Sequence, residues 1–309
     1  MILILMMFMG GVYLTVTGSL FSVISDEPEM HLTKDSVLLL RVSGVILSAE
    51  KVLKQLDKYG NDSKVKAVVI RVDSPGGVVG ASQEYYTGIK KFRAATKKPV
   101  IISCANLAAS GAYYTAVAGD VIYTNPGTLM GSIGVIMEFA NLQGLYDWAK
   151  IKRYVVKTGP YKDSGAEYRA MRDDELKLFQ TMIDEVYKQF KLAVAEGRKL
   201  PLEKVEPFAD GRIFTGEFAV KNGFADKLGD LEDAITEAGI TGGIKGKPEV
   251  FEPKKWRANF LELFLNRSDD EDESLGSADW AKTFSRVLRT ELLGKPLFLL
   301  PGVLEGTHN

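Results

Sequence analysis

Short apolar, β-prone runs alternate with segments of helical periodicity in the first half of this chain, and no other feature constrains the fold as strongly. The runs at 36–47, 65–72 and 99–104 are nearly continuous in apolar residues, which is typical of strands buried on both faces of a parallel sheet. Helical spacing of apolar residues lies between them, at 49–58 and 81–94. The sequence therefore predicts an α/β domain with a largely parallel sheet.

Ser48 is expected to cap the helix at 49–58. The remaining predicted elements are three short strands and four helices. The strands are expected at 120–124, 132–137 and 152–157. The helices are expected at 173–196, 202–208, 231–238 and 280–293. The first of these helices is long and amphipathic, because its apolar residues recur at three- and four-residue spacing.

Residues 1–24 carry no charge, and a helix of that length spans about 36 Å. No Lys or Arg precedes this apolar run, and no alanine occurs before Ala49. Both observations favour an uncleaved transmembrane anchor over a cleaved signal peptide, which is the alternative. His31 and Lys34 are too few basic residues to reverse the topology, so we expect the following domain to face outside the cell.

Histidine and cysteine are scarce, and this limits the chemistry. The two histidines are His31 and His308, neither in the middle of the chain, which argues against a Ser-His-Asp triad. Cys104 is the single cysteine and lies in an apolar run, so a buried structural thiol is expected rather than a disulfide framework. Without an H-E-x-x-H motif or clustered His and Cys, no metal or cofactor is expected. The net charge of −1 does not indicate the basic surface that binds nucleic acid.

Residues 106–115 read Asn-Leu-Ala-Ala-Ser-Gly-Ala-Tyr-Tyr-Thr and follow a predicted strand. Small residues surround Ser110 on both sides, which lets other backbone approach its hydroxyl closely. A serine nucleophile beside an oxyanion hole needs this access. The alternative is a strand-to-helix corner that packs tightly and has no catalytic part.

Two loops provide candidate partners for Ser110. Asp73-Ser-Pro-Gly-Gly77 directly follows a strand, and a glycine amide there can stabilise an oxyanion; the alternative is an ordinary Pro-Gly turn. Lys162 lies in a loop rich in Gly and Pro, and it is the general base that remains when histidine is absent. A lysine base must be neutral, so its pKa must fall by about 3 units from about 10.4, which requires cover by other chain. The alternative is a solvated surface lysine.

Together these stretches resemble the short bacterial form of signal peptide peptidase A, the serine-lysine membrane peptidases of family S49. The resemblance covers most of 36–239. The motifs that carry it are Asp-Ser-Pro-Gly-Gly at 73–77, Ala-Ala-Ser-Gly-Ala-Tyr-Tyr at 108–114, Gly-Thr-Leu-Met-Gly-Ser-Ile-Gly at 127–134, Lys-Thr-Gly-Pro-Tyr-Lys-Asp at 157–163, and the stretch at 214–227.

The resemblance implies a role for each candidate residue. Ser110 matches the nucleophile and Lys162 the general base. Gly77 and Gly111 match the positions whose amides form the oxyanion hole. Ser132 matches a serine that positions the lysine amine, although it reads equally as a turn residue without a catalytic part.

The resemblance also implies a Clp protease/crotonase-like fold and a homo-oligomeric ring, which the family suggests is an octamer. Such rings lie on the outer face of the cell membrane, and the dyad can form within or between protomers. Applied to this chain, the expected organisation is an anchor at 1–24, a juxtamembrane linker at 25–35, a peptidase domain at 36–240 and an extension at 241–309 with an acidic linker at 268–274.

The expected activity is that of a membrane-anchored serine endopeptidase that degrades released signal peptides and other short apolar peptides. The apolar segment at 297–304 itself resembles such a substrate, and we expect it to occupy an active-site groove or, alternatively, to pack elsewhere or stay disordered. Two other functions are considered: a crotonase-like acyl-CoA enzyme and a non-catalytic membrane scaffold.

Overall fold

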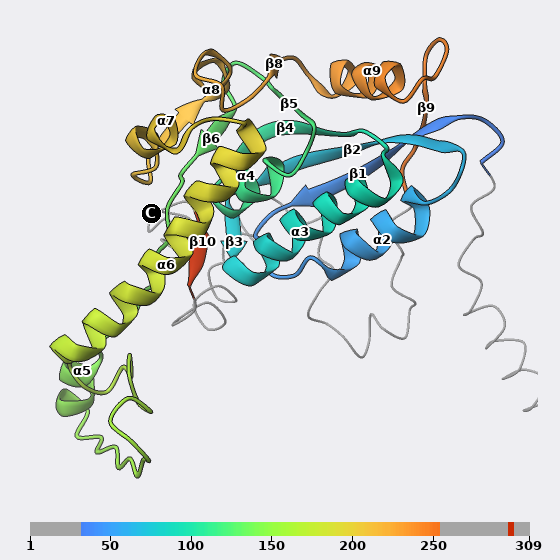
Figure 1. Ribbon diagram of the computed structural model, residues 1–309. Helices are drawn as coiled ribbons and strands as arrows, with labels where there is room; N and C mark the ends of the chain where they lie inside the picture. Colours follow the sequence, from blue (N-terminus) through green and yellow to red (C-terminus); the bar gives the residue numbers. More distant parts are fainter. Residues whose placement is uncertain (1–31, 254–295, 300–309) are drawn as a thin grey trace, which may run out of the picture. The chain divides into compact units, whose positions relative to one another are not determined.

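The computed structural model describes residues 32–253 and 296–299 (Figure 1). The expected anchor at 1–24, the acidic linker at 268–274 and the helix at 280–293 lie outside the described residues. The chain divides into a unit Met1–Lys34 and a unit Asp35–Asn309, and every described helix and strand lies in the second unit. Among the residues that the structure describes, no helix has the length and apolar character needed to cross a membrane.

A sheet of 8 strands forms the centre of this unit. Its main path is β7-β6-β4-β2-β1-β9; β5 also pairs with β4, and β8 pairs with β5. Its strands are β1 (Ser36–Ser43), β2 (Val65–Ser74), β4 (Val100–Ala109), β5 (Val121–Thr124), β6 (Leu129–Gly131), β7 (Ile213–Thr215), β8 (Lys227–Leu228) and β9 (Glu249–Phe251). Every pair in it is parallel except β6 with β7. The predicted α/β class with a largely parallel sheet is confirmed.

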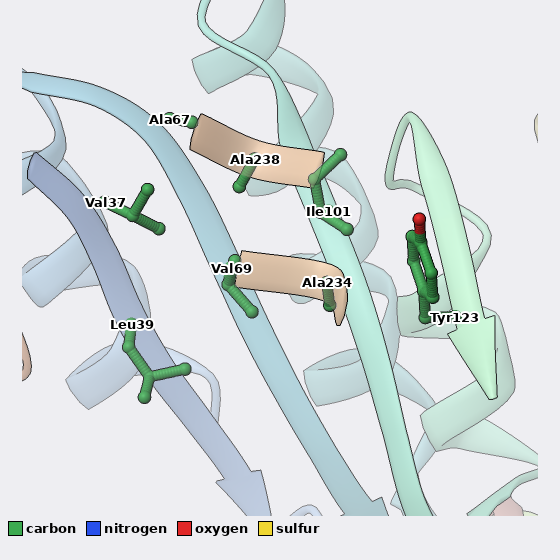
Figure 2. Close-up of a cluster of buried hydrophobic side chains, with 8 residues drawn as sticks. All are labelled: Val37, Leu39, Ala67, Val69, Ile101, Tyr123, Ala234 and Ala238. Carbon is green, nitrogen blue, oxygen red and sulfur yellow. The ribbon is translucent and has the colours of Figure 1, made fainter. Parts of the chain in front are cut away.

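Helices cover both faces of the sheet, which explains why its strands are nearly continuous in apolar residues. Helices α2 (Glu50–Gly60) and α3 (Val79–Thr96) lie on one side, and α9 (Leu231–Thr241) lies on the other (Figure 1). Figure 2 shows the α9 side, where alternate strand residues meet two alanines of α9. The cluster consists of Val37, Leu39, Ala67, Val69, Ile101, Tyr123, Ala234 and Ala238.

Two predicted strands are wrong. Residues 132–137 form no strand; the strand in this region is β6, which ends one residue earlier. Gly131 and Ser132 have φ angles of 85° and 50°, and such left-handed backbone cannot continue a strand. Residues 152–157 form no strand either and are exposed. Strand-prone residues there have no neighbouring strand to pair with among the described residues.

Helix α6 (Asp173–Arg198) agrees with the predicted long helix, but only part of it packs on the sheet domain. Phe190 and Val194 in its C-terminal half are fully buried, whereas Leu176 near its start is 59% exposed. A segment that we call the arm, residues 142–172, lies at the N-terminal end of α6 and contains α5 (Gln143–Trp148) (Figure 1). The polypeptide returns to the sheet through α7 (Leu202–Val205), the 3-10 helix η1 (Glu206–Phe208) and α8 (Gly216–Lys221).

The capping prediction for Ser48 is shifted by one position. Helix α2 begins after Ala49, whose side chain cannot cap it. Ser48 still contributes, because its Oγ accepts a hydrogen bond from the Glu50 amide at 3.2 Å. The hydroxyl therefore satisfies one of the amides in the first turn that have no partner inside the helix.

Candidate active site

Ser110 occupies a sharp corner between β4, which ends at Ala109, and α4 (Gly111–Ala116). Its φ of 54° and ψ of −118° lie outside the usual regions for a residue with a side chain. The residue is 1% exposed, and its Oγ has no hydrogen-bond partner among the described residues. Strained backbone and a buried unpaired hydroxyl are both costly, and residues of this kind concentrate at functional sites.

Ser132 lies beside Ser110 because the two serines follow register partners. Strands β4 and β6 run parallel, with Ala109 opposite Gly131. The Ser110 amide donates to the Gly131 carbonyl at 2.8 Å. Ser132 is 3% exposed. The structure therefore brings together two of the predicted site residues that are far apart in sequence.

Gly77 lies in β3 (Gly76–Val78), and the backbone at Ile46 runs parallel beside it. The Ile46 amide donates to Gly76 and its carbonyl accepts from Val78, both at 2.8 Å. A Cβ on Gly77 would lie 2.1 Å from the Ile46 carbonyl oxygen, so only glycine fits this close approach. Helix α4 contacts β3, which places the candidate oxyanion amides of Gly77 and Gly111 on neighbouring elements.

Sequence analysis missed the residues that hold the Gly77 loop. The Asp73 carboxylate accepts from Asn106 Nδ2 at 3.0 Å and from the Leu107 amide at 3.2 Å. The Ser74 hydroxyl accepts from the Gly76 amide at 3.1 Å. These bonds tie the loop to the strand that leads to Ser110. The signal was present in the motif, since Asp and Ser after a strand commonly accept from nearby backbone amides.

An extended segment of the same chain lies on β3. Strand β10 (Leu297–Leu299) pairs with β3 in antiparallel orientation, with Phe298 opposite Gly77. The Val79 amide donates to the Pro296 carbonyl at 3.4 Å, next to this ladder. Strand β10 also contacts α4. The edge of β3 beside Ser110 therefore accepts an extended peptide backbone.

Lys162 is exposed and lies in a turn at residues 161–165, which we call the lysine turn. This turn is fixed to the start of α6, because Ser164 Oγ donates to Glu175 at 3.1 Å. Helix α4 meets α6 much further along, where the rings of Tyr114 and Phe190 lie 5.0 Å apart. Glu175 and Phe190 are separated by about 22 Å of helix. A single chain therefore does not bring Lys162 to Ser110.

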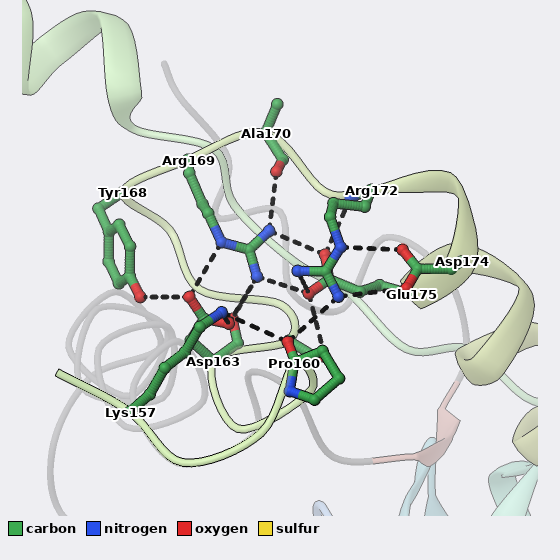
Figure 3. A network of polar contacts seen from close by, with 10 residues as sticks. Lys157, Pro160, Asp163, Tyr168, Arg169, Ala170, Arg172, Asp174 and Glu175 are labelled. Carbon is green, nitrogen blue, oxygen red and sulfur yellow. Dashed lines mark hydrogen bonds and ion pairs between the residues drawn. The ribbon is translucent and has the colours of Figure 1, made fainter. Parts of the chain in front are cut away.

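Charged side chains surround the lysine turn (Figure 3). Arg169 lies between Asp163 and Glu175 and pairs with both, and we call these three residues the arginine cluster. Hydrogen bonds from Arg169, from the Arg172 amide and from Ser164 lower the pKa of Glu175 to about 2. Bonds from Arg169 and then Lys157 hold the pKa of Asp163 well below its usual range. The cluster is therefore ionised at neutral pH.

The arm exposes an unusual amount of apolar surface. Trp148 is 79% exposed, Tyr154 87%, and Val156 fully. Leu145 and Ile151 are each 53% exposed. Large contiguous apolar patches on a protein surface usually mark an interaction site.

Two other expectations concern side chains outside this site. Cys104 is completely buried, and burial raises the pKa of its thiol to about 12, so the prediction of a buried structural thiol is confirmed. Within 32–253 and 296–299, no group of three or more His, Cys, Asp or Glu residues is placed to hold a metal ion.

A family model and several protease-named relatives support one family for this chain. The sequence model of peptidase family S49 matches residues 92–245. A Synechocystis protein named "Putative protease slr0021" is 42% identical over 214 residues, which are 69% of this chain and 76% of that protein. "Protease 4" of Salmonella typhi is 34% identical over 65% of this chain, and "Putative signal peptide peptidase SppA" of Enterococcus faecium is 37% identical over 59% of it. The aligned regions cover 31% and 53% of these two relatives.

Proposed function

The chain belongs to peptidase family S49 and is a serine peptidase, and from this premise we propose a Ser-Lys dyad with Ser110 as nucleophile and Lys162 as general base. Residues 36–240 form the peptidase domain in this proposal, with a fold of the Clp protease and crotonase type. The proposed substrates are released signal peptides and other short apolar peptides. The Enterococcus relative is named as a signal peptide peptidase, which supports this substrate class.

The observation that carries the proposal is the buried hydroxyl of Ser110, which has no partner within the described part of the chain and lies beside a strand edge that already holds an extended peptide segment. An antiparallel ladder alternates between hydrogen-bonded and non-bonded pairs. Val79 and Pro296 form a hydrogen-bonded pair. Gly77 and Phe298 lie two residues further along the same ladder, so the alternation makes them a hydrogen-bonded pair as well. A substrate bound in the same way would direct a carbonyl at the Gly77 amide.

The reaction follows from these groups. Neutral Lys162 accepts the Ser110 proton while Oγ attacks the scissile carbonyl carbon, and the amides of Gly77 and Gly111 stabilise the oxyanion. The lysine then gives this proton to the leaving amine, and an acyl-enzyme forms. Water, deprotonated by the same lysine, hydrolyses the ester and returns Ser110. Ser132, adjacent to Ser110, would hold the lysine amine in place.

The base must come from a second copy of the chain, because one chain holds Lys162 far from Ser110. We therefore propose a homo-oligomeric ring, an octamer by resemblance, in which the arm of one protomer reaches the serine of the next. The exposed apolar residues of the arm support this, since a neighbour would bury them. The neighbour would also supply the desolvation that a neutral lysine needs.

The proposed location is the cell membrane, with residues 1–24 as a single anchor and the catalytic domain on the extracytoplasmic side. The uncharged character of these residues supports it. They lie outside the described residues, so this part of the proposal depends on the sequence.

A mixing experiment with the full chain in detergent tests the dyad and the ring together. We expect Ser110→Ala and Lys162→Ala each to lose cleavage of a fluorogenic apolar peptide while remaining folded. Mixed and reassembled, the two inactive variants should regain part of the wild-type rate, because some interfaces then contain both residues. Normal turnover by Lys162→Ala would refute Lys162 as the base.

A wild type that is inert on peptides but binds acyl-CoA would favour the crotonase-like alternative. A wild type that is inert in both assays would favour the non-catalytic scaffold.

A further inference from the structure

We propose that Arg169 is a positioning residue for the Lys162 base, holding the lysine turn on the first turn of α6. The inference rests on the proposed function, because it takes Lys162 as the base. Arg169 stays protonated and is paired with Asp163 and Glu175, so it is not itself the base. Its role is to fix the backbone that carries the lysine.

The contacts of Arg169 join the lysine turn, at Asp163, to the first turn of the helix. Its Nε and Nη2 donate to the Asp163 carboxylate at 3.1 and 2.8 Å, and Nη1 donates to Glu175 at 2.8 Å. Nη2 also donates to the Asp163 carbonyl at 3.0 Å. The side chains of Arg169, Asp163 and Glu175 are 23%, 11% and 0% exposed. A planar guanidinium suits this arrangement, since it presents several donors in one rigid fork.

The backbone on both sides of Lys162 is held, while the lysine side chain is not. On one side, the Pro160 carbonyl accepts from Arg172 Nη2 at 3.2 Å. On the other, Asp163 bonds to Arg169, and Ser164 bonds to Glu175. Lys162 is exposed and makes no hydrogen bond or ion pair with the described residues. The turn is therefore pre-organised, and it leaves the Lys162 side chain exposed.

The same contacts control the charge next to the base. Asp163 directly follows Lys162, and a carboxylate without a partner near a lysine favours the protonated amine. Arg169 and Lys157 both pair with Asp163, which offsets its charge. The ion-paired residues of this region are Arg153, Lys157, Asp163, Glu167, Arg169, Arg172, Asp174 and Glu175. Removal of Arg169 takes a positive charge away from the carboxylates of Asp163 and Glu175. The net charge around Lys162 then becomes more negative.

The test measures the pH dependence of peptide cleavage by the full chain. In Arg169→Met we expect kcat to fall about tenfold or more, because misplaced catalytic groups lose rate steeply, with KM little changed. We expect the acid limb of the pH profile to move up by about 0.5–1 unit. In the double variant Arg169→Met/Asp163→Asn, the acid limb of the pH profile should return to its wild-type position, because the carboxylate of Asp163 is also removed. Its kcat should stay low, because the lysine turn is still not fixed. Arg41→Met is the control, since it removes an exposed arginine of β1 that pairs with Glu252, away from the arm, and its kcat should stay within about twofold of wild type.

Arg169→Lys keeps the positive charge but loses the planar guanidinium with its several donors. If Arg169→Met does not fold, Arg169→Lys tests whether Arg169 positions the base. We expect Arg169→Lys to fold, to keep the wild-type limb and to lose kcat several-fold. Wild-type kcat and an unchanged profile in this variant would overturn the inference, as would an Arg169→Met variant that is less stable but catalytically normal. The proposed function fails separately: Lys162→Ala would then be active, whatever Arg169 does.

Discussion

Ser110 and Ser132 stand side by side at the ends of two parallel strands, directly after the register partners Ala109 and Gly131. Both serines have left-handed backbone, with φ angles of 54° and 50°. A single strand pairing therefore sets the relative position of the proposed nucleophile and the proposed lysine-positioning hydroxyl. Because both side chains are buried at this edge, a base that enters here loses contact with water.

Replacement of Ser110 by alanine should abolish peptide cleavage without destabilising the protein. The hydroxyl has no partner among the described residues, so its removal relieves the cost of a buried unpaired group. We expect the rate of cleavage to fall by about 10³-fold or more and the melting temperature to stay equal or rise, as measured by circular dichroism. A large fall in melting temperature would show that Ser110 supports the fold instead.

Gly77 and Gly80 form a matched pair for alanine substitution. Gly77→Ala places a Cβ 2.1 Å from the Ile46 carbonyl, and we expect a loss of stability of about 1–3 kcal/mol together with activity. Gly80 lies in α3, where an added Cβ would meet no described atom within 4 Å, so Gly80→Ala should gain up to about 1 kcal/mol. Urea denaturation measures both. Equal effects of the two substitutions would contradict the close approach of Ile46 to Gly77.

The attachment of the arm should depend on pH through Glu175. Its pKa in the folded chain is lowered to about 2 from 4.5, so the carboxylate stabilises the fold fully above about pH 4.5, and this stabilisation is lost as pH falls toward 2. Hydrogen exchange should show the amides of 157–172 losing protection in that window before those of β2 and β4. Glu175→Gln is the control, because its arm should open without this pH dependence. Simultaneous loss of protection in arm and sheet would contradict the prediction.

The segment at 296–299 should inhibit peptide cleavage, since it lies on the strand that we propose for substrate. Deletion of 296–309 is expected to raise turnover several-fold at low substrate, because a tethered segment competes at an effective concentration of order millimolar. Phe298→Pro should act in the same way by removing an amide from the ladder with β3. Deletion of 303–309 alone is the control and should have a smaller effect. Unchanged turnover in the deletion of 296–309 and in Phe298→Pro would contradict inhibition by this segment.

The apolar surface of the arm should hold the oligomer together. Val156→Asp is expected to reduce both the assembled fraction in analytical ultracentrifugation and peptide cleavage, because a charge at an apolar interface is costly to bury. Ile240→Asp is the matched control, since Ile240 is also largely exposed, at 69%, but lies on α9. Full activity from a monomeric Val156→Asp would refute the interprotomer dyad.

The sequence alone determined the elements whose signal is local. The continuous apolar runs of β1, β2 and β4 identified a parallel sheet, and the small residues around Ser110 made it a candidate nucleophile, because both follow from residue type and spacing. The same local reasoning failed at 132–137 and 152–157. Strand-prone residues become a strand only where a partner is available, and spacing along one chain does not show that.

Only the tertiary structure decided which distant residues meet. The pairing of β4 with β6 brings Ser132 to Ser110, and the bonds of Asp73 fix the glycine loop to Asn106. The separation of Lys162 from Ser110 follows from the length of α6 and from the arginine cluster at its start. These relationships depend on strand register and on long-range ion pairs, which arise when separate segments pack together, and residue type and local spacing do not specify them.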